Sequence, residues 1–386
     1  MGATLFSPLT VAGTTFPNRI VVSPMCQYRA IDGAASDWHM IHLGQFALSG
    51  AGLVMIEATG VEAAGRITPG CLGLYTDAQE EALARVLKVF RHVGKMPVGI
   101  QIGHAGRKAS SHVPWDGGHG LAEGEGAWTI VAPSAVAYDE HRAVPEALDG
   151  EGMRRIVAAF VQAAERAERI GLDVVELHAA HGYLLHQFIA PLVNRRTDAY
   201  GGSRENRLRF PLEVAAALRA VWPEGKVLGA RINGPDLLPG GATIEDTIAF
   251  ADGLKKAGFD YVCVSAGSLI GGQRFEAFPG YLLPYAEAVK RETGLVTQGV
   301  GMIVDPFLAE QSIATGQVDM VAIARAFLED PRWVWHAAEK LGIAMPFPPE
   351  YRGADPAIWR GAAHRPLLCS EPGTTAEAMR TASAAT

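Results

Sequence analysis

The sequence of 386 residues has few cysteines, no long apolar run and no excess of basic residues. Its four cysteines lie far apart and form no CxxC pair, which argues against a disulfide framework or an iron–sulfur cluster and fits a reducing cytosol. No apolar stretch approaches the length of a membrane span, and no secretory signal is evident at the N-terminus. The net charge of −7 argues against nucleic-acid binding. We therefore expect a cytoplasmic protein without nucleic-acid or membrane partners.

What the chain does contain is a regular alternation of short apolar runs with amphipathic segments. Eight strands are expected, at residues 20–24, 53–57, 97–102, 173–177, 226–232, 260–265, 295–299 and 319–323. Helices are expected at 38–49, 77–93, 151–170, 203–221, 243–257 and 281–292, then from Asp305 and near Pro331. Such alternation favours parallel strands with right-handed crossovers, and eight units suffice for a closed (β/α)₈ barrel. A doubly wound open sheet is the alternative, but no G-x-G-x-x-G opens a βα unit. We predict an α/β fold, a single TIM barrel.

Two regions exceed what a minimal barrel needs. A long loop rich in Gly, Pro and Trp follows the third strand, over residues 105–150. After about Gly353 the composition shifts to Ala, Ser, Thr and Pro with little periodicity. We expect a barrel domain over residues 1–352 and a C-terminal tail over 353–386, partly disordered or at a subunit interface, with 371–386 loosely tethered.

The segment 173–187 places proton-handling side chains directly behind the fourth strand. His178, His181 and Tyr183 follow the apolar run with no intervening loop. If a helical turn begins at His178, the two imidazoles share a face and can donate to one carbonyl or oxyanion, while Tyr183 approaches from another side. A metal site or two satisfied core histidines are the alternatives. Polar groups at the carboxyl end of a buried parallel strand indicate an enzyme.

Other strand ends also carry polar or flexible residues. Gly299 and Gly301 precede an expected helix, where backbone N–H groups can approach a phosphate, and Arg325 can add charged hydrogen bonds. A tight turn and a surface arginine explain the same residues. Arg231 needs an anionic or acceptor partner if it points into the barrel mouth. Cys26 is also explained as a small buried apolar side chain, and Gln101 as a side chain that caps a backbone group.

Four segments carry a family resemblance: SPMCQY (23–28), QIGHAGRK (101–108), HAAHGYLLHQF (178–188) and PLVNRRTDAYGGSRENR (191–207). With Arg231, Gly301 and Arg325, they resemble the old yellow enzyme family of flavin-dependent ene-reductases, in the subgroup of xenobiotic reductases and thermophilic-like relatives. The likeness covers roughly residues 5–342.

The resemblance implies one FMN, bound without a covalent link, and NADPH or NADH as co-substrate. The Gly301 backbone and Arg325 would hold the phosphate, and Arg231 would face the N1/C2-carbonyl edge of the ring. Gln101 would hydrogen-bond the ring, together with backbone near Pro24, Cys26 and Ala58. The full expected cofactor site comprises Ser23, Pro24, Met25, Cys26, Ala58, Gln101, His178, Arg231, Gly299, Gly301, Ala324 and Arg325.

The resemblance also implies ping-pong reduction of activated alkenes such as enones, maleimides and nitroalkenes. His178 and His181 would bind the substrate oxygen, and Tyr183 would protonate Cα. Cys26 would tune the flavin potential, and Tyr28 would lie over the substrate pocket. No metal is expected.

The chain departs from the family pattern at several positions. Ala324 stands where relatives usually have Gly, and Val300 replaces a Trp near the pocket. The resemblance also implies a homodimer or homotetramer. A C-terminal residue of one subunit would reach the active site of its neighbour, and Arg352 and Trp359 are the candidates. Three rival functions are a dienoyl-CoA reductase, whose cluster cysteines are missing, a zinc hydrolase using the histidines as ligands, and a non-catalytic flavin-binding protein.

Overall fold

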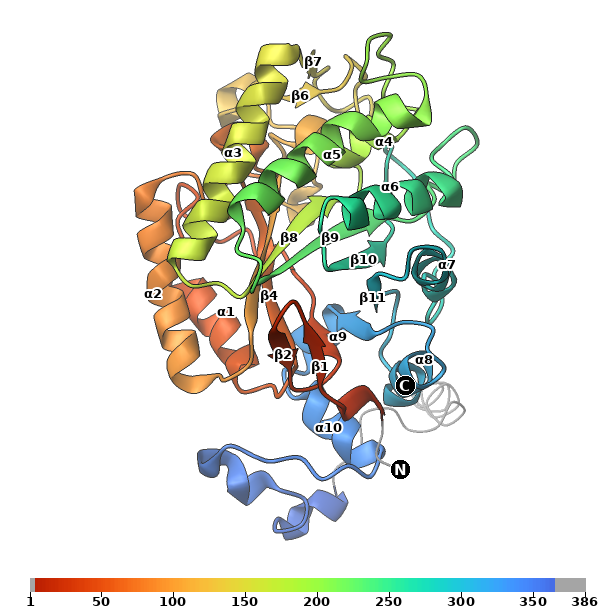
Figure 1. The fold of residues 1–386 in the computed structure, drawn as a ribbon. Coiled ribbons are helices and arrows are strands. Elements are labelled where there is room, and N and C mark those ends of the chain that lie inside the picture. Colours follow the sequence, from red (N-terminus) through yellow and green to blue (C-terminus); the bar gives the residue numbers. More distant parts are fainter. Residues whose placement is uncertain (1–3, 365–386) are drawn as a thin grey trace, which may run out of the picture.

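A computed structural model of the chain describes residues 4–364 and contains a closed barrel of eight strands (Figure 1). All eight strands pair in parallel, in the order in which they occur along the chain. They are β3 (Ile20–Val22), β4 (Leu53–Gly60), β5 (Val98–Gly103), β8 (Val174–Ala179), β9 (Val227–Asn233), β10 (Tyr261–Ser265), β11 (Val296–Gly299) and β12 (Met320–Ile323). The predicted (β/α)₈ barrel is confirmed.

A helix follows each strand of the barrel. After β5 the helix, α3, comes only at the end of the long loop. The helices are α1 (Asp37–Ala47), α2 (Asp77–Val93), α3 (Gly150–Arg169), α4 (Leu184–Ile189), α5 (Arg204–Val221), α6 (Ile244–Lys256), α7 (Leu283–Thr293), α8 (Pro306–Ala314), α9 (Arg325–Glu329) and α10 (Trp333–Lys340). Short α4 and α9 were not expected as separate helices. They begin directly behind the polar ends of β8 and β12, and so shape the region where the candidate site lies.

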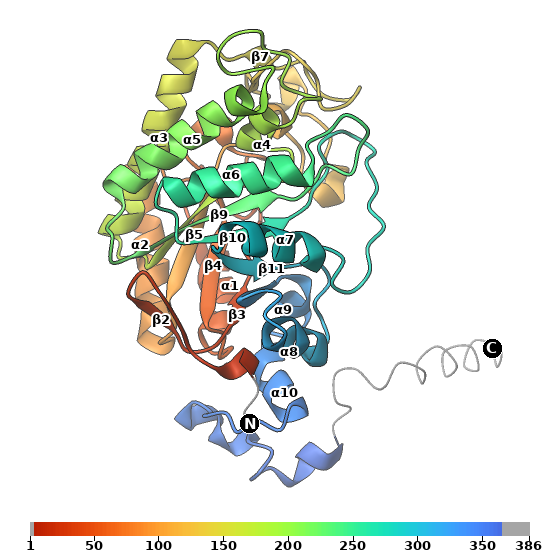
Figure 2. The same ribbon diagram turned by 45° about the vertical axis from the view of Figure 1, so that its right-hand side comes forward.

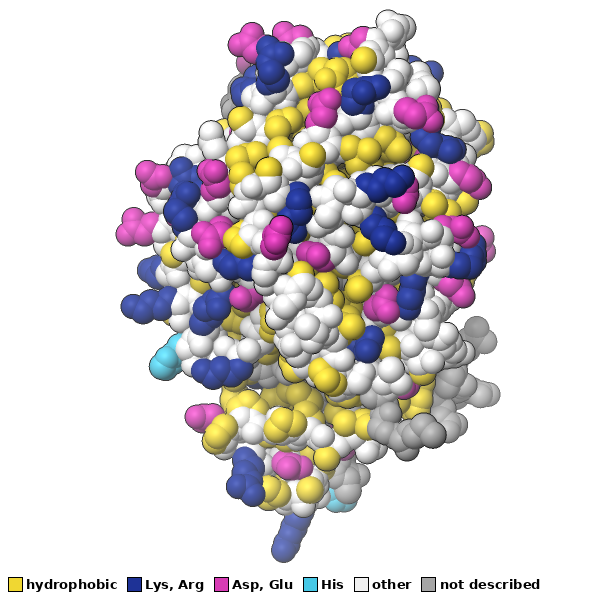
Figure 3. Space-filling view, in the orientation of Figure 1, with side chains coloured by type: hydrophobic (Ala, Val, Ile, Leu, Met, Phe, Trp, Pro, Cys, Tyr) yellow, Lys and Arg dark blue, Asp and Glu magenta, His cyan; other side chains and the backbone are white. Residues whose placement is uncertain are grey.

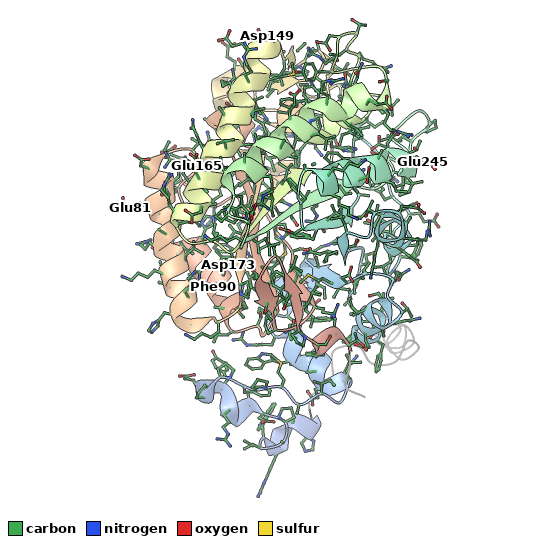
Figure 4. The ribbon with its side chains drawn as sticks, in the orientation of Figure 1. Glu81, Phe90, Asp149, Glu165, Asp173 and Glu245 are labelled. Carbon is green, nitrogen blue, oxygen red and sulfur yellow. The ribbon has the colours of Figure 1, made fainter. Side chains whose placement is uncertain are left out.

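Helix α3 illustrates how the sequence builds one of these layers. Asp149 caps the helix by accepting a hydrogen bond of 2.7 Å from the Gly152 backbone N–H. Met153, Ile156 and Phe160 recur at helical spacing and are buried against the barrel. Asp149 and Asp173 lie at opposite ends of α3 in Figure 4. The helix therefore leads the chain back to the start of β8.

The interior of the barrel has its own apolar core, separate from the layer between strands and helices. It contains Val21, Leu53, Val174 and Val227 from four strands, together with Val11 and Phe16. The last two come from a hairpin, β1 (Leu9–Val11) and β2 (Thr14–Phe16), which was not expected from the sequence. Since Val21, Leu53, Val174 and Val227 all lie at or near the starts of their strands, the hairpin closes the amino-terminal end of the barrel.

The long loop after β5 is partly ordered. It contains three 3₁₀ turns, η3 (Gly106–Lys108), η4 (Pro114–Asp116) and η5 (Glu123–Glu125), and the small sheet β6 (Val131–Ala132) with β7 (Glu146–Ala147). Beyond α10, residues up to 364 form the turns η6 (Pro349–Ala354) and η7 (Arg360–His364) and extend away from the barrel (Figure 2). The expected loosely tethered segment 371–386 lies outside the described residues.

The surface in view in Figure 3 carries lysine and arginine interspersed with aspartate and glutamate. Among residues 4–364, no helix combines the length and the apolar character needed to cross a membrane.

Candidate active site

The barrel register brings the predicted polar residues together at the carboxyl ends of the strands. Gln101 on β5 lies opposite Glu176 on β8, and His178 on β8 lies opposite Arg231 on β9. All four side chains are buried. Because parallel strands of a barrel end at one face, these side chains form one continuous polar floor.

The path of the chain behind β8 differs from the expected helical turn at His178. The strand continues through Ala179, which pairs with Ile232 of β9, so His178 is a strand residue. A turn follows in which His181 has the left-handed backbone conformation, with φ of 59°. The expectation was wrong because ladder hydrogen bonds to β9 hold the backbone extended one residue past His178. The imidazoles nevertheless converge, with ring centroids 5.1 Å apart and planes at 80°.

Both imidazoles are held in defined surroundings. His178 Nδ1 accepts a hydrogen bond of 3.2 Å from the Ala180 N–H, which leaves the proton on Nε2. His181 Nε2 lies 2.8 Å from Ser265 Oγ, and its backbone N–H donates to Asn233 Oδ1 at 3.2 Å. Burial lowers the pKa of His178 and of His181 well below the usual value, and the charge of Arg231 adds to the effect in both. The pair is therefore neutral at physiological pH.

Tyr183 is the residue just before α4 and packs against His178. Their ring centroids are 4.8 Å apart at an interplanar angle of 81°. Lys108 places its Nζ 5.1 Å from the centre of the Tyr183 ring. Burial raises the pKa of Tyr183 well above its usual value, so the phenol is protonated in the free protein.

A cavity of about 440 Å³ opens beside His181 and extends to the ends of β11 and β12. Its lining includes Ser23, His181, Arg231, Val300, Gly301, Ala324 and Arg325. The Ser23 hydroxyl and the Arg231 Nε are buried there and have no hydrogen-bond partner within the described chain. Unpaired buried donors cost free energy, so they fit a ligand with acceptor atoms such as the ring and phosphate of FMN.

Gly301 lies at the edge of this cavity in a conformation that favours glycine. Its φ is 114°, and a Cβ at this position would stand 3.1 Å from the Leu282 backbone nitrogen. Gly299 ends β11, and Ala324 directly precedes Arg325, the first residue of α9. The predicted phosphate-binding residues are thus assembled on one side of the cavity.

The loop after β3 and the end of β4 carry further residues of the predicted site. Tyr28 is partly buried in a left-handed conformation, with φ of 55°, and its ring meets Trp115 edge-on at 5.6 Å. Burial raises the pKa of the Cys26 thiol well above its usual value, with nearby Cys71 adding to the effect. Pro24 and Met25 lie in the same loop. Ala58 lies at an irregularity in the β4–β5 pairing and lines a smaller cavity together with His178 and Tyr183.

Several residues at the site were missed. Glu176 accepts hydrogen bonds from Gln101 and Tyr261, Ser265 and Asn233 bind His181, and Trp115 meets Tyr28 from the long loop. Ser265 and Asn233 stand at strand ends in the sequence, which was the available signal. Trp359 borders a different cavity, together with Trp335 of α10. Within residues 4–364, no group of three or more His, Cys, Asp or Glu side chains is arranged to hold a metal ion.

Comparison with known proteins places this geometry in a family. Residues 4–343 match the NADH:flavin oxidoreductase / NADH oxidase family. The NADPH dehydrogenase of Geobacillus thermodenitrificans is 40% identical over 353 residues, covering 91% of this chain and 98% of the relative. That of Bacillus subtilis is 39% identical, covering 91% and 99%. The solved structure of morphinone reductase superposes with a TM-score of 0.74 at 30% identity, covering 93% of both chains.

These matches span the barrel and every strand end that contributes to the site. They confirm the resemblance to old yellow enzymes drawn from the motifs at residues 23–28, 101–108 and 178–207. The chain belongs to the NADH:flavin oxidoreductase / NADH oxidase family and is an FMN-dependent oxidoreductase that takes electrons from a reduced nicotinamide nucleotide.

Proposed function

We propose that this enzyme is an NADPH-dependent ene-reductase that reduces the C=C bond of activated alkenes such as enones, maleimides and nitroalkenes. Its bacterial relatives are named NADPH dehydrogenases, and a structural neighbour is named morphinone reductase. When bound, FMN accepts electrons from the nicotinamide and supplies the hydride that the alkene takes up at Cβ in a ping-pong cycle. The protein binds, polarises and protonates the substrate.

The two histidines are proposed to bind the carbonyl or nitro oxygen of the substrate. The N–H of His178 Nε2 is free to donate because Nδ1 is occupied by the Ala180 N–H. The His181 ring centroid lies 5.1 Å from that of His178. Because His181 Nε2 lies 2.8 Å from Ser265 Oγ, Nδ1 is its nitrogen left to approach the same substrate oxygen. Neutral imidazoles in a buried site are preorganised donors, which stabilise negative charge that develops on that oxygen.

Tyr183 is proposed as the acid that protonates Cα. It is protonated in the resting enzyme, and its ring stands edge-on to His178 at 4.8 Å. A substrate whose oxygen is held by the imidazoles therefore lies within reach of the phenol. The O–H bond of Tyr183 breaks as the new C–H bond forms, and solvent returns a proton to the phenolate afterwards.

The remaining strand-end residues are proposed to hold FMN. Arg231 and Ser23 offer unpaired buried donors, Gln101 adds an amide, and Gly301 with Arg325 would bind the phosphate. The backbone or side chains of the following residues would complete the site: Pro24, Met25, Cys26, Ala58, His178, Gly299 and Ala324. Cys26 is a neutral thiol here and would tune the flavin potential through its contact with the ring.

Roles for Tyr28 and for the C-terminal segment are also proposed. Tyr28 would lie over the substrate, in keeping with its strained backbone and its contact with the exposed Trp115. The barrel domain 1–352 would assemble into a cytoplasmic homodimer or homotetramer, in which Arg352 or Trp359 reaches a neighbouring site. The segment that bears both residues projects from the barrel, and both are exposed.

The observation that carries the proposal is the convergence of the rings of His178, His181 and Tyr183, of which His181 lines a cavity that holds unpaired donors. The direct test is product analysis with purified protein. We expect one heat-released FMN per chain, and one equivalent of saturated ketone formed per NADPH oxidised with 2-cyclohexenone under anaerobic conditions. Release of FAD or of no flavin, or oxidation of NADPH without saturated ketone, would contradict it.

A further inference from the structure

A lysine from a distant loop connects the two proposed catalytic elements. Lys108, the last residue of η3, donates from Nζ to the carbonyl oxygen of His181 at 2.9 Å and to that of Ser268 at 3.2 Å. The same Nζ lies 5.1 Å from the centre of the Tyr183 ring and 4.9 Å from that of Tyr138. One ammonium group thus joins the loops after β5, β8 and β10.

The contact with His181 supports an unusual backbone conformation. A non-glycine residue with φ of 59° is disfavoured by contacts between Cβ and the backbone. Lys108 binds the carbonyl of that same residue, and Asn233 accepts from its N–H at 3.2 Å. The lysine therefore helps to hold the turn that presents both His181 and Tyr183.

The charge of Lys108 is not neutralised locally. Within the described chain, no carboxylate lies within ion-pair distance of it, and its hydrogen-bond acceptors are oxygens of His181 and Ser268. The titratable and charged groups around it are Arg107 on η3, Tyr138, Asp139 and Arg142 on the loop before α3, and His178, His181 and Tyr183 on and behind β8. A cation over the Tyr183 ring attracts negative charge that forms on it, and Arg142 acts in the same direction.

We propose that Lys108 is a positioning residue whose charge stabilises the phenolate left on Tyr183 when its proton moves to Cα. This inference rests on the proposed role of Tyr183 as the acid. Burial makes a phenolate costly there, and a nearby cation lowers that cost in the transition state. The electron pair of the breaking O–H bond stays on the Tyr183 oxygen, the proton forms the C–H bond at Cα, and water later reprotonates the phenolate.

Lys108 would also make this step dependent on pH. Burial, with the charges of Arg142 and Arg107, lowers the pKa of Lys108 to about 7. Its cation is present below that pH and is lost as pH rises through it. The histidines stay neutral over this range because their pKa values are lowered, and Tyr183 stays protonated because its pKa is raised. Protonation of the substrate should therefore slow as pH rises from 6 to 8.

The test compares Lys108→Met with Lys108→Arg in the FMN-loaded enzyme. The oxidative half-reaction with 2-cyclohexenone is followed by stopped flow between pH 5.5 and 9. The wild type should lose about tenfold in rate around pH 7. Lys108→Arg should move that decline beyond pH 9, and Lys108→Met should be slow and flat throughout. Lys226, whose Nζ lies 5.3 Å from the Trp222 ring, provides the control Lys226→Met, with an unchanged profile.

Phenol binding separates this role from a merely structural one. Lys108→Met should keep phenol affinity within about twofold, because the imidazole donors remain and the His181 N–H still binds Asn233 in the turn. A lost phenol complex would show that Lys108 acts only by holding the turn, and would overturn the electrostatic role. A wild-type profile in Lys108→Met would overturn it as well. If Tyr183→Phe reacts at the wild-type rate, the acid assignment fails instead. With Tyr183→Phe slow, adding Lys108→Met should slow it no further, and an additive loss would contradict the proposed coupling.

Discussion

Gln101 donates a hydrogen bond of 2.7 Å from its side-chain amide to Glu176 at the centre of the barrel. Glu176 also accepts a bond of 2.8 Å from the Tyr261 hydroxyl, and all three side chains are buried. Since the Gln101 nitrogen faces Glu176, its carbonyl oxygen is left to accept from a ligand. This arrangement suits the N3–H of a flavin ring.

We predict that Glu176→Leu weakens FMN binding by about tenfold or more, because it leaves the Gln101 and Tyr261 donors unpaired at a cost of about 1–3 kcal/mol each. Fluorescence titration of apoprotein with FMN measures this, and urea unfolding measures the accompanying loss of stability. Glu176→Gln retains an acceptor and is the matched control, expected to bind FMN more tightly than Glu176→Leu. Equal affinities for the wild type and Glu176→Leu would show that this network does not orient the cofactor site.

Replacing His178 by Ala removes the donor whose direction is set by the Ala180 N–H. Alkene reduction should fall by about 10²–10³, the usual effect of losing one preorganised donor to a developing oxyanion. Phenols should bind wild-type enzyme as phenolates and produce a long-wavelength charge-transfer band with oxidised FMN, which His178→Ala should abolish. An unchanged band, or activity restored by added zinc, would show that the histidine has another function.

The phosphate side of the cavity can be tested at Gly301. Gly301→Ala should weaken FMN binding, because a Cβ there is strained at φ of 114° and would press on Leu282 and Tyr281. Gly316→Ala introduces comparable backbone strain at φ of 77°, but with nothing within 4 Å of the new Cβ. Equilibrium dialysis with FMN should therefore show a loss in the first variant only. Equal losses in both would indicate general destabilisation.

Much of the fold was predictable because its signals are local. Most barrel strands are short runs of β-branched and apolar residues followed by an amphipathic helix, as at β9 and α6. The hairpin of β1 and β2 was missed because strands of three residues, Leu9–Val11 and Thr14–Phe16, carry too little periodicity to be recognised. Their role in closing the barrel depends on contacts with strands far along the chain.

The candidate site was predictable in its membership but not in its local geometry. Strand ends marked His178, Arg231 and Gln101, because a barrel brings those ends together whatever the loops do. The left-handed turn at His181 depends on Asn233, 52 residues away, and on Lys108, 73 residues away. No pattern within the segment 178–183 contains that information, so spacing alone favoured a helical turn.

The division of labour between the imidazoles and Tyr183 is tested most directly by stopped-flow measurement of the two half-reactions in Tyr183→Phe. This variant keeps the ring packed against His178 and removes only the phenolic proton. We predict nearly wild-type reduction of FMN by NADPH, and a loss of roughly 10²-fold in the reaction with an enone. Nitroalkenes should lose less, because their nitronate can leave without a proton from the protein. Equal slowing of both half-reactions would contradict the account, since Tyr183 would then position groups at the site, and the proton would come from elsewhere.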